Sequence, residues 1–462
     1  MVDVLLIYPY FRPSHDHSVF RFPPLGLGYI ASHLRSNNVS VQVVDCTFLD
    51  ETHVIRKVHE LSPSIIGIYS MYTMEENSKW FARLFKPECD LVVTGGPLPS
   101  ICPERFLQDF DVVVVGEGEQ TMLELARSTE NGDLSGIPGI VYNENHTRDK
   151  KAPPIHSRVL FNRPRQVVAD LDSLQFPARD LFDNDSYQRQ YKKTFGYSLT
   201  SMMSSRGCPF SCDFCSKPVF GDTFRARSPR NVVDEIEEVL SYGYDGVFFQ
   251  DDCFTLDKKR VTLICDEIIR RGLKLEWECL SRVDVVDSDI MRKMRQAGCR
   301  RVFFGIESGN DTVLRTMRKE FTADQAGKAV RLARSEGIRA GAFFILGYPG
   351  ETDDTIIDTI RFSTSLPLDY LSYTLPYPMP GTGLYEKANH DAGTVPPKAP
   401  ARHRLIDHDL VFRSPFSERK LKFAIAKATT QFRLRKHLGD PGYSLIGRSF
   451  EVLSDLAFRA LK

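Results

Sequence analysis

Short apolar segments alternate with helix-like segments along most of this chain, and that alternation constrains the fold more than any other feature. In residues 1–130 the apolar segments predict strands at 4–8, 41–44, 65–69, 91–94 and 112–115. Helical periodicity predicts helices between them, at 25–36, 53–61, 75–85, 103–108 and 120–127. Strands that alternate with crossover helices pair in parallel, so this region is predicted to form a doubly wound, Rossmann-like α/β domain.

The alternation stops in a stretch richer in Pro, Asn and Asp and then resumes. Strands are predicted at 198–204, 246–250, 274–279, 301–305, 340–346 and 370–375, with helices at 229–242, 257–271, 287–297, 322–337 and 352–365. Because these βα units are too few for a closed eight-stranded barrel, they predict a partial (β/α)6 barrel of the TIM type. We therefore expect an α/β domain at 1–130, a linker or bridging segment at 131–195 with a hairpin near 140–146, a barrel domain at 196–385, and a small mainly helical domain at 386–462.

Charge and hydropathy exclude several kinds of partner. The chain has 60 Lys and Arg against 60 Asp and Glu, so no net field would draw it to nucleic acid or to an anionic bilayer. Its first residues carry no basic signal region, and no run of about 18 uncharged apolar residues occurs. We expect a cytoplasmic protein without a membrane span and without a nucleic-acid partner.

Three of the 10 cysteines lie close together, in Cys208-Pro-Phe-Ser-Cys212-Asp-Phe-Cys215, directly after the first strand of the predicted barrel. Three sulfurs cannot complete a tetrahedral zinc site, and no fourth Cys or His follows at zinc-finger spacing. They can hold three irons of a [4Fe-4S] cluster and leave the fourth iron open to a substrate. Cys208, Cys212 and Cys215 are thus predicted metal ligands and catalytic residues. A zinc site or a fully ligated electron-transfer cluster is the alternative.

This cysteine spacing at this place in a partial barrel resembles the radical S-adenosylmethionine (SAM) enzymes. The resemblance implies that SAM lies across the strand ends of the barrel. It places Asp251 and Asp252 near the SAM amino group, Arg282 near the carboxylate, and Glu307 and Ser308 near the ribose and methionine. A further segment, which contains Leu346, is implied to pack near the adenine.

Glycines follow the strands of the first domain, at the sheet edge where doubly wound folds bind ligands. Gly95-Gly96-Pro97 and Gly116-Glu117-Gly118-Glu119 resemble the cobalamin-binding domain that precedes many radical SAM barrels. A generic nucleotide-binding sheet is the alternative, although no Gly-x-Gly-x-x-Gly opens its first helix. The expected cobalamin contacts are Tyr8, Met71, Tyr72, Gly95, Gly96, Pro97, Gly116, Glu117 and Gly118. The Asp-x-His-x-x-Gly signature of a lower histidine ligand is absent, so the loop 70–74 is expected to place an apolar or weakly ligating side chain under cobalt.

Together the two resemblances imply a cobalamin-dependent radical SAM C-methyltransferase, of the class B family. Such an enzyme uses SAM, a [4Fe-4S] cluster and cobalamin to move a methyl group from methylcobalamin to an unactivated carbon radical. The acceptor is expected to be a peptide, a protein or a small molecule, and the electron donor a ferredoxin or flavodoxin. Chain size and domain order are similar to enzymes that C-methylate a glutamine of methyl-coenzyme M reductase. Two alternatives stay open: a cyclase or rearrangement enzyme with both cofactors and no methyl transfer, and a non-catalytic corrinoid or iron–sulfur carrier.

Overall fold

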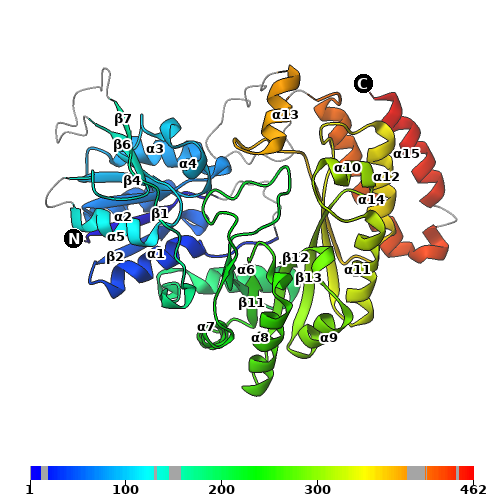
Figure 1. The fold of residues 1–462 in the computed structure, drawn as a ribbon, viewed down its shortest axis with the longest axis horizontal. Coiled ribbons are helices and arrows are strands. Elements are labelled where there is room, and N and C mark those ends of the chain that lie inside the picture. Colours follow the sequence, from blue (N-terminus) through cyan, green and yellow to red (C-terminus); the bar gives the residue numbers. More distant parts are fainter. Residues whose placement is uncertain are drawn as a thin grey trace.

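Two sheets, the first mainly parallel and the second entirely parallel, are each covered by helices and stand next to one another in this computed structural model (Figure 1). The structure describes residues 2–11, 19–128, 133–144, 158–392, 412, 414–443 and 447–461. In Figure 1 the first sheet is drawn in blue to cyan, the second in green to yellow, and the C-terminal helices in orange to red. This arrangement confirms the predicted fold class: a doubly wound first domain, a partial barrel and a helical end.

The first sheet has the strand order β2-β1-β3-β4-β5-β6-β7. Its parallel strands are β1 (Val4–Tyr8), β2 (Val41–Asp45), β3 (Ile65–Tyr69), β4 (Leu91–Gly95) and β5 (Val112–Val114). Helices α1 (Leu25–Ser36) and α5 (Glu119–Ser128) bury their apolar faces on one side, and α2 (Glu51–Leu61), α3 (Glu75–Phe85) and α4 (Pro97–Ile101) cover the other. The connections reverse direction between the neighbouring strands β1 and β3, and such a switch point opens a ligand crevice at the carboxyl ends of the strands.

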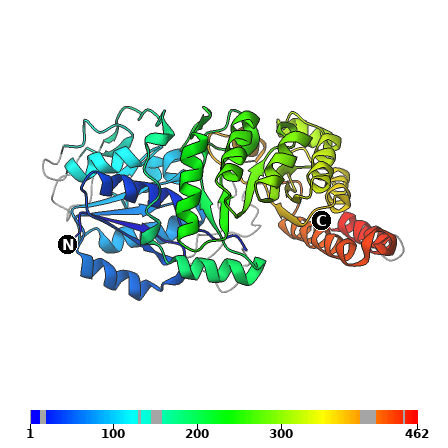
Figure 2. The same cartoon turned by 90° about the horizontal axis from the view of Figure 1, so that it is seen from below.

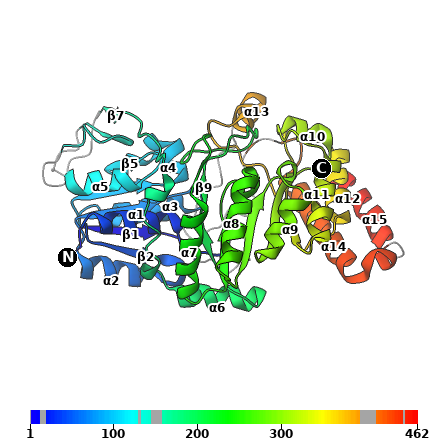
Figure 3. The ribbon, with the colours of Figure 1, turned by 60° about the horizontal axis from the view of Figure 1, so that its bottom comes forward.

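The sheet does not end at residue 130. Two antiparallel strands, β6 (Ile140–Asn143) and β7 (Val159–Phe161), extend it within the segment expected to be a linker. The hairpin expected near 140–146 is therefore a wider connection, and residues 145–157 lie outside the described part of the chain. The same segment ends in helix α6 (Asn184–Phe195), which Figure 3 shows at the base of the barrel.

The second sheet has the order β15-β14-β13-β12-β11-β8, and its neighbouring strands all pair in parallel. The strands are β8 (Leu199–Met202), β11 (Gly246–Phe249), β12 (Glu276–Ser281), β13 (Cys299–Glu307), β14 (Arg339–Ile345) and β15 (Tyr370–Thr374). The helices are α7 (Pro229–Ser241), α8 (Lys258–Arg270), α9 (Ser288–Gln296), α10 (Asp311–Thr316), α11 (Ala323–Ser335) and α12 (Asp353–Ser365). β8 and β15 form the two edges, so the barrel stays open on one side.

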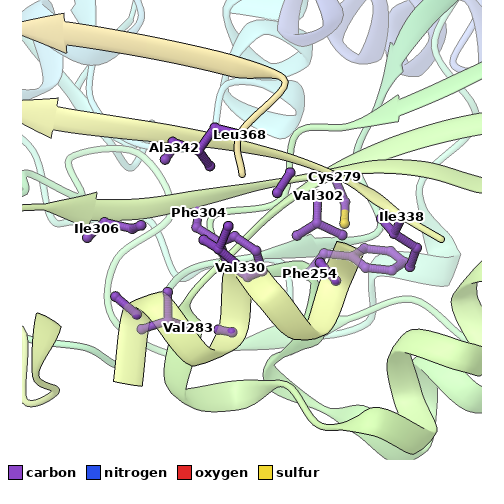
Figure 4. Close-up of a cluster of buried hydrophobic side chains, with 14 of the residues drawn as sticks. Phe254, Cys279, Val283, Val302, Phe304, Ile306, Val330, Ile338, Ala342 and Leu368 are labelled. Carbon is purple, nitrogen blue, oxygen red and sulfur yellow. The ribbon is translucent and has the colours of Figure 1, made fainter. Parts of the chain in front are cut away.

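The barrel core lies between the strands and this outer layer of helices. Val302, Phe304 and Ile306 of β13 are buried in one cluster with Val330 of α11, and Figure 4 shows Phe304 beside Val330. Because alternate residues of a strand point to opposite faces, Phe303 of the same strand points into the barrel instead.

Aromatic rings fill the barrel interior, and one of them comes from the first domain. Phe20 lies between β1 and α1 in sequence, yet its ring centroid is 5.4 Å from that of Phe303 and 5.3 Å from that of Tyr370. It also lies 5.9 Å from the ring of Phe248 on β11. The segment after β1 thus closes the base of a barrel that its own strands leave open.

The chain ends in helices α13 (Gly383–Ala392), α14 (Glu418–Gly442, with a break at Gly439) and α15 (Arg448–Ala460). α14 and α15 pack against α12, on the side of the barrel away from the first domain (Figure 2). Among the helices of the described residues, none combines the length and apolar character needed to cross a membrane.

Candidate active site

A cavity of about 620 Å³ lies where the carboxyl ends of β1, β3, β4 and β5 face the barrel. All the expected cobalamin contacts except Tyr72 line it: Tyr8, Met71, Gly95, Gly96, Pro97, Gly116, Glu117 and Gly118. The barrel side is formed by Ser201, Met203, Arg206 and Gln250. Tyr72 points elsewhere and packs its ring 4.3 Å from that of Tyr377, after β15.

Glycines allow a large ligand to approach the backbone here. Gly96 has a φ of +115°, and a Cβ at this position would stand 2.6 Å from the carbonyl oxygen of Ser70, so a larger residue would clash. A Cβ at Gly26, which also lines the cavity, would have no atom within 4 Å. The cavity also continues under α5, along Leu6 and Met122. A cavity of this volume, lined by glycines and apolar side chains, fits a large ligand such as cobalamin.

The buried tyrosine hydroxyl groups that line the cavity stay protonated. Burial raises the pKa of Tyr8 well above its usual value, and the nearby Tyr69 and Asp45 raise it further. Tyr187, on α6, donates its hydroxyl proton to Asp45 Oδ2 at 2.6 Å. Sequence reasoning missed Tyr187, because no local motif marks a residue that reaches this cavity from the bridging segment.

The Gly-Glu-Gly-Glu segment binds the barrel domain through buried ion pairs. Glu117 Oε1 accepts hydrogen bonds from Arg206 Nη1 at 3.0 Å and from Arg225 Nη1 at 2.9 Å. Glu119 Oε1 accepts from Arg206 Nη2 at 2.6 Å. Arg206 and Arg225 pair across the short strands β9 (Ser205–Arg206) and β10 (Arg225–Ala226). Glu117 therefore joins the first domain to the base of the loop that carries the three cysteines.

That loop, residues 207–224, is closed at its neck and braced from within. Gly207 has a φ of +83°, and a Cβ there would lie 2.3 Å from the carbonyl oxygen of Thr223. Lys217 Nζ donates to the carbonyl oxygens of Cys208 at 2.7 Å and of Phe210 at 3.0 Å. These contacts define the backbone path of the loop that carries the three thiols.

The thiols influence one another electrostatically. Burial raises the pKa of Cys215 to about 11, and the charges of Cys212, Asp252 and Cys208 add to the effect. Burial likewise raises the pKa of Cys208. Without a bound cation, the raised pKa values of Cys208 and Cys215 favour the thiol form of these two side chains, and iron would supply the positive charge that thiolates need.

Within the described residues, no three His, Cys, Asp or Glu side chains are grouped so as to hold a single metal ion. A [4Fe-4S] cluster does not need such a group, because each of its cysteine sulfurs bonds a different iron atom. Three thiols on one braced loop fit that donor set better than a mononuclear zinc site.

Arg282 follows β12 and reaches the cysteine loop. Its Nη1 donates to Cys212 Sγ at 3.4 Å, and its Nε and Nη2 donate to Asp284 at 3.0 and 2.8 Å. Its Nη2 also donates to the carbonyl oxygen of Lys319 at 2.7 Å. All three nitrogens are engaged, so the structure gives Arg282 partners other than the expected SAM carboxylate.

The two aspartates after β11 differ. Asp251 is buried, and its Oδ1 and Oδ2 accept from the backbone and the hydroxyl of Ser204 at 2.7 and 2.6 Å. It fixes the chain that leads into the cysteine loop, and both of its carboxylate oxygens are engaged there. Asp252 is exposed at the loop and lies within electrostatic reach of Cys208 and Cys215.

The expected SAM contacts after β13 and β14 also have different surroundings. Glu307 is buried in the left-handed region, with a φ of +75°, and lies 3.4 Å from the ammonium of Lys319. Ser308 turns away and shares a hydrogen bond of 2.9 Å with Thr359 on α12. Leu346 is buried in the core between strands and helices. Lys319, which sequence reasoning missed, is buried beside the ring of Phe214 of the cysteine loop.

Comparison with known proteins agrees with this two-part site. Residues 202–363 match the model of the radical SAM superfamily, and residues 16–126 match that of the B12 binding domain. An uncharacterised methyltransferase of Pyrococcus horikoshii is 35% identical over 379 residues, which cover 79% of this chain and 78% of the relative. An anaerobic magnesium-protoporphyrin IX monomethyl ester cyclase of Cereibacter sphaeroides is 26% identical over 94% of this chain and 74% of its own length.

Among solved structures, the methyltransferase TsrM of Kitasatospora setae has the same fold. Its structure, with cobalamin and a [4Fe-4S] cluster bound, superimposes with a TM-score of 0.67 at 22% identity, over 82% of this chain and 73% of that one.

The fold and the site therefore define an enzyme that brings a corrinoid domain against a radical-generating barrel. The chain belongs to the radical SAM superfamily, in the branch that carries an N-terminal B12 binding domain. Its cofactors are cobalamin, a [4Fe-4S] cluster and SAM.

Proposed function

We propose that this enzyme is a methyltransferase that moves a methyl group from methylcobalamin to a carbon atom of its acceptor. The observation that carries the proposal is the single cavity in which the glycine-rich strand ends of the first domain face the barrel next to the cysteine loop. The relative of 35% identity, which is named a methyltransferase, supports the same reaction.

Cys208, Cys212 and Cys215 are the proposed iron ligands of the cluster. The cobalamin contacts proposed are those that line the cavity, with Glu117 acting as an interdomain ion-pair partner. Asp252 and Glu307 are the proposed SAM contacts, because Asp252 is exposed at the cysteine loop and Glu307 lies beside the Lys319 ammonium. Asp251, Ser308 and Leu346 serve as supports, since the structure engages or buries their side chains. When bound, the cluster and SAM supply a radical that removes hydrogen from the acceptor, and methylcobalamin supplies the methyl group.

The protein residues orient these groups and keep water away. Tyr8, Tyr69 and Phe20 contribute aromatic rings to the cavity lining, and Arg206, which also lines the cavity, is held by two glutamates. Exclusion of water matters because a carbon radical and a reduced cobalt ion both react with competing solutes.

The acceptor we propose, from chain size and domain order, is a glutamine of methyl-coenzyme M reductase. A small-molecule acceptor is the alternative, with reduction of the cluster by a ferredoxin or flavodoxin in either case. A second candidate function is cyclisation without methyl transfer, and the 26% identity to the cyclase over 94% of this chain favours it.

Product analysis separates the two functions. The full chain is reconstituted anaerobically with iron, sulfide and cobalamin, supplied with SAM, reductant and candidate acceptors, and its nucleosides are quantified by mass spectrometry. Methyl transfer predicts S-adenosylhomocysteine and 5′-deoxyadenosine in similar amounts, both dependent on the acceptor. Deoxyadenosine alone, with cobalamin bound, would overturn the proposed methyl transfer and favour cyclisation.

The variant Cys212→Ala tests the proposed ligands. We expect it to lose deoxyadenosine formation entirely and to keep cobalamin, because Cys212 is on the barrel loop and not on the cavity wall. Cys102→Ala is the matched control, since Cys102 is also a partly buried free thiol but lies in the first domain. Loss of cobalamin from Cys212→Ala, or deoxyadenosine formation by it, would contradict the assignment.

A further inference from the structure

Arg282 makes the one hydrogen bond to a proposed cluster sulfur that comes from a side chain in the described residues. We propose that Arg282 is a positioning residue that raises the reduction potential of the [4Fe-4S] cluster through this N–H···S bond to Cys212. The inference rests on the proposed ligation of the cluster by Cys208, Cys212 and Cys215.

The guanidinium is held rigidly from several directions. Asp284 binds it through two oxygens, at 3.0 Å to Nε and 2.8 Å to Nη2, and the Lys319 carbonyl oxygen fixes Nη2 from another side. A planar group with three fixed bonds cannot rotate away, so Nη1 stays directed at Cys212 Sγ, 3.4 Å away.

Aromatic rings shield the same group from water. The guanidinium carbon stands 3.7 Å from the ring centroid of Phe210, which belongs to the cysteine loop, and 5.4 Å from that of Phe321. Arg282 is only 5% exposed. Because water is excluded, the N–H dipole acts on the sulfur through a medium that screens it weakly.

A donor at this sulfur favours the reduced cluster. Reduction adds one electron from the external donor to the cluster and breaks no bond, so the negative charge shared by irons and sulfurs increases. An N–H group directed at a ligand sulfur stabilises that added charge, and such bonds are among the factors that set the potential of iron–sulfur clusters. Asp284 balances the positive charge of Arg282, so the directed N–H bond remains as the main effect.

Potentiometric titration of the full, reconstituted chain without SAM tests the inference. The reduced cluster is quantified by electron paramagnetic resonance at each applied potential, for the parent protein and for Arg282→Met. We expect the ratio of reduced to oxidised cluster at the parent midpoint to fall about tenfold, which corresponds to about 59 mV for a one-electron couple.

Arg318→Gln is the matched control. Arg318 also lies at the cysteine loop, 3.7 Å from Asp213 next to Cys212, but it is 65% exposed. Its loss removes the same charge without removing the hydrogen bond to Cys212. We expect its cluster to titrate close to the parent. A shift in Arg318→Gln equal to that in Arg282→Met would overturn the inference, and so would an unshifted Arg282→Met.

Two charge-conserving variants test the inference if Arg282→Met does not retain its cluster. Arg282→Lys keeps the charge but lacks the planar fork, and Arg318→Lys makes the same exchange at the control site. A lowered potential in Arg282→Lys alone supports the inference, and equal potentials overturn it. Failure of the parent protein to hold a cluster would instead defeat the proposed ligation.

Discussion

Glu351, in the turn between β14 and α12, is a single residue whose surroundings oppose its charge. Its Oε2 accepts backbone hydrogen bonds from Gly347 at 2.6 Å and Tyr348 at 2.8 Å, while its Oε1 has no partner among the described residues. Burial raises the pKa of this carboxyl group to about 7, against the lowering effect of the two backbone donors. Near neutral pH the folded protein therefore takes up a proton that the unfolded chain releases.

This proton uptake predicts a loss of stability as the pH rises. Between pH 4.5 and about 7 the folded state holds more protons than the unfolded state, so the free energy of unfolding falls through that window. Glu351→Gln, which keeps an acceptor for the backbone, should remove this decline and be more stable than the parent at pH 8, by up to about 3 kcal/mol. Urea denaturation of the parent and of Glu351→Gln at pH 5 and pH 8 measures this difference in stability. The exposed Glu386→Gln on α13 is the control, and an unchanged pH slope in Glu351→Gln would contradict the assignment.

At the scale of elements, the shape of the cysteine loop depends on the backbone at its neck. Gly207 and Gly221 both have positive φ angles, +83° and +70°, but only Gly207 is enclosed. A Cβ on Gly207 would meet the carbonyl oxygen of Thr223 at 2.3 Å, whereas a Cβ on Gly221 would meet nothing within 4 Å. The two glycines thus share a positive φ angle and differ in whether a side chain would clash with the neighbouring backbone.

This difference predicts opposite outcomes for the same substitution. Gly207→Ala should separate the two sides of the neck and lower the iron content of the reconstituted protein at least tenfold. Gly221→Ala should retain iron, because it pays only the cost of its φ angle, about 1 kcal/mol. Iron and sulfide analysis after reconstitution decides between them. Equal iron content in the two variants would show that the neck does not control the loop.

The sequence predicts the elements with strong periodicity well. The structure reproduces the expected ranges of β1, β3, α1 and α3 to the residue, because apolar strands bounded by turns and amphipathic helices have distinct patterns. The structure differs from the predicted ranges where the local sequence signals are weak. β7 has only three residues and pairs with β6 across a long connection, and the helix expected at 103–108 is a single 3₁₀ turn after the short α4.

The site follows the same division. The three cysteines could be predicted as cluster ligands from their spacing. The partnerships of Glu117 with Arg206, and of Arg282 with Cys212, could not, because they join residues that only the tertiary fold brings together. In the same way, sequence shows that Asp251 is a polar residue at a strand end but not that it binds Ser204.

At the scale of the whole molecule, the two domains are held together by charges that water cannot reach. Glu117 and Arg206 have side chains only 2% and 3% exposed. By contrast, the ion pair that joins Arg35 of α1 to Asp180 of the bridging segment is 38% and 51% exposed. Buried pairs are costly to break because the remaining charge loses its partner, whereas exposed pairs contribute little.

We therefore expect Glu117→Gln to lower the free energy of unfolding by about 3 kcal/mol, since Arg225 would lose its charged partner. Asp180→Asn should change it by less than about 1 kcal/mol. Chemical denaturation of both variants in the same buffer provides the comparison. If the two substitutions were equally mild, the buried network would not be what holds the domains together.

The position of Phe20 inside the barrel has a consequence for the order of events during synthesis. Phe20 leaves the ribosome with the first domain, but its partners Phe248, Phe303 and Tyr370 are translated much later. Domains generally fold as they emerge, N-terminal part first. The nascent first domain therefore carries Phe20 without these three barrel partners until the last barrel strand has been synthesised.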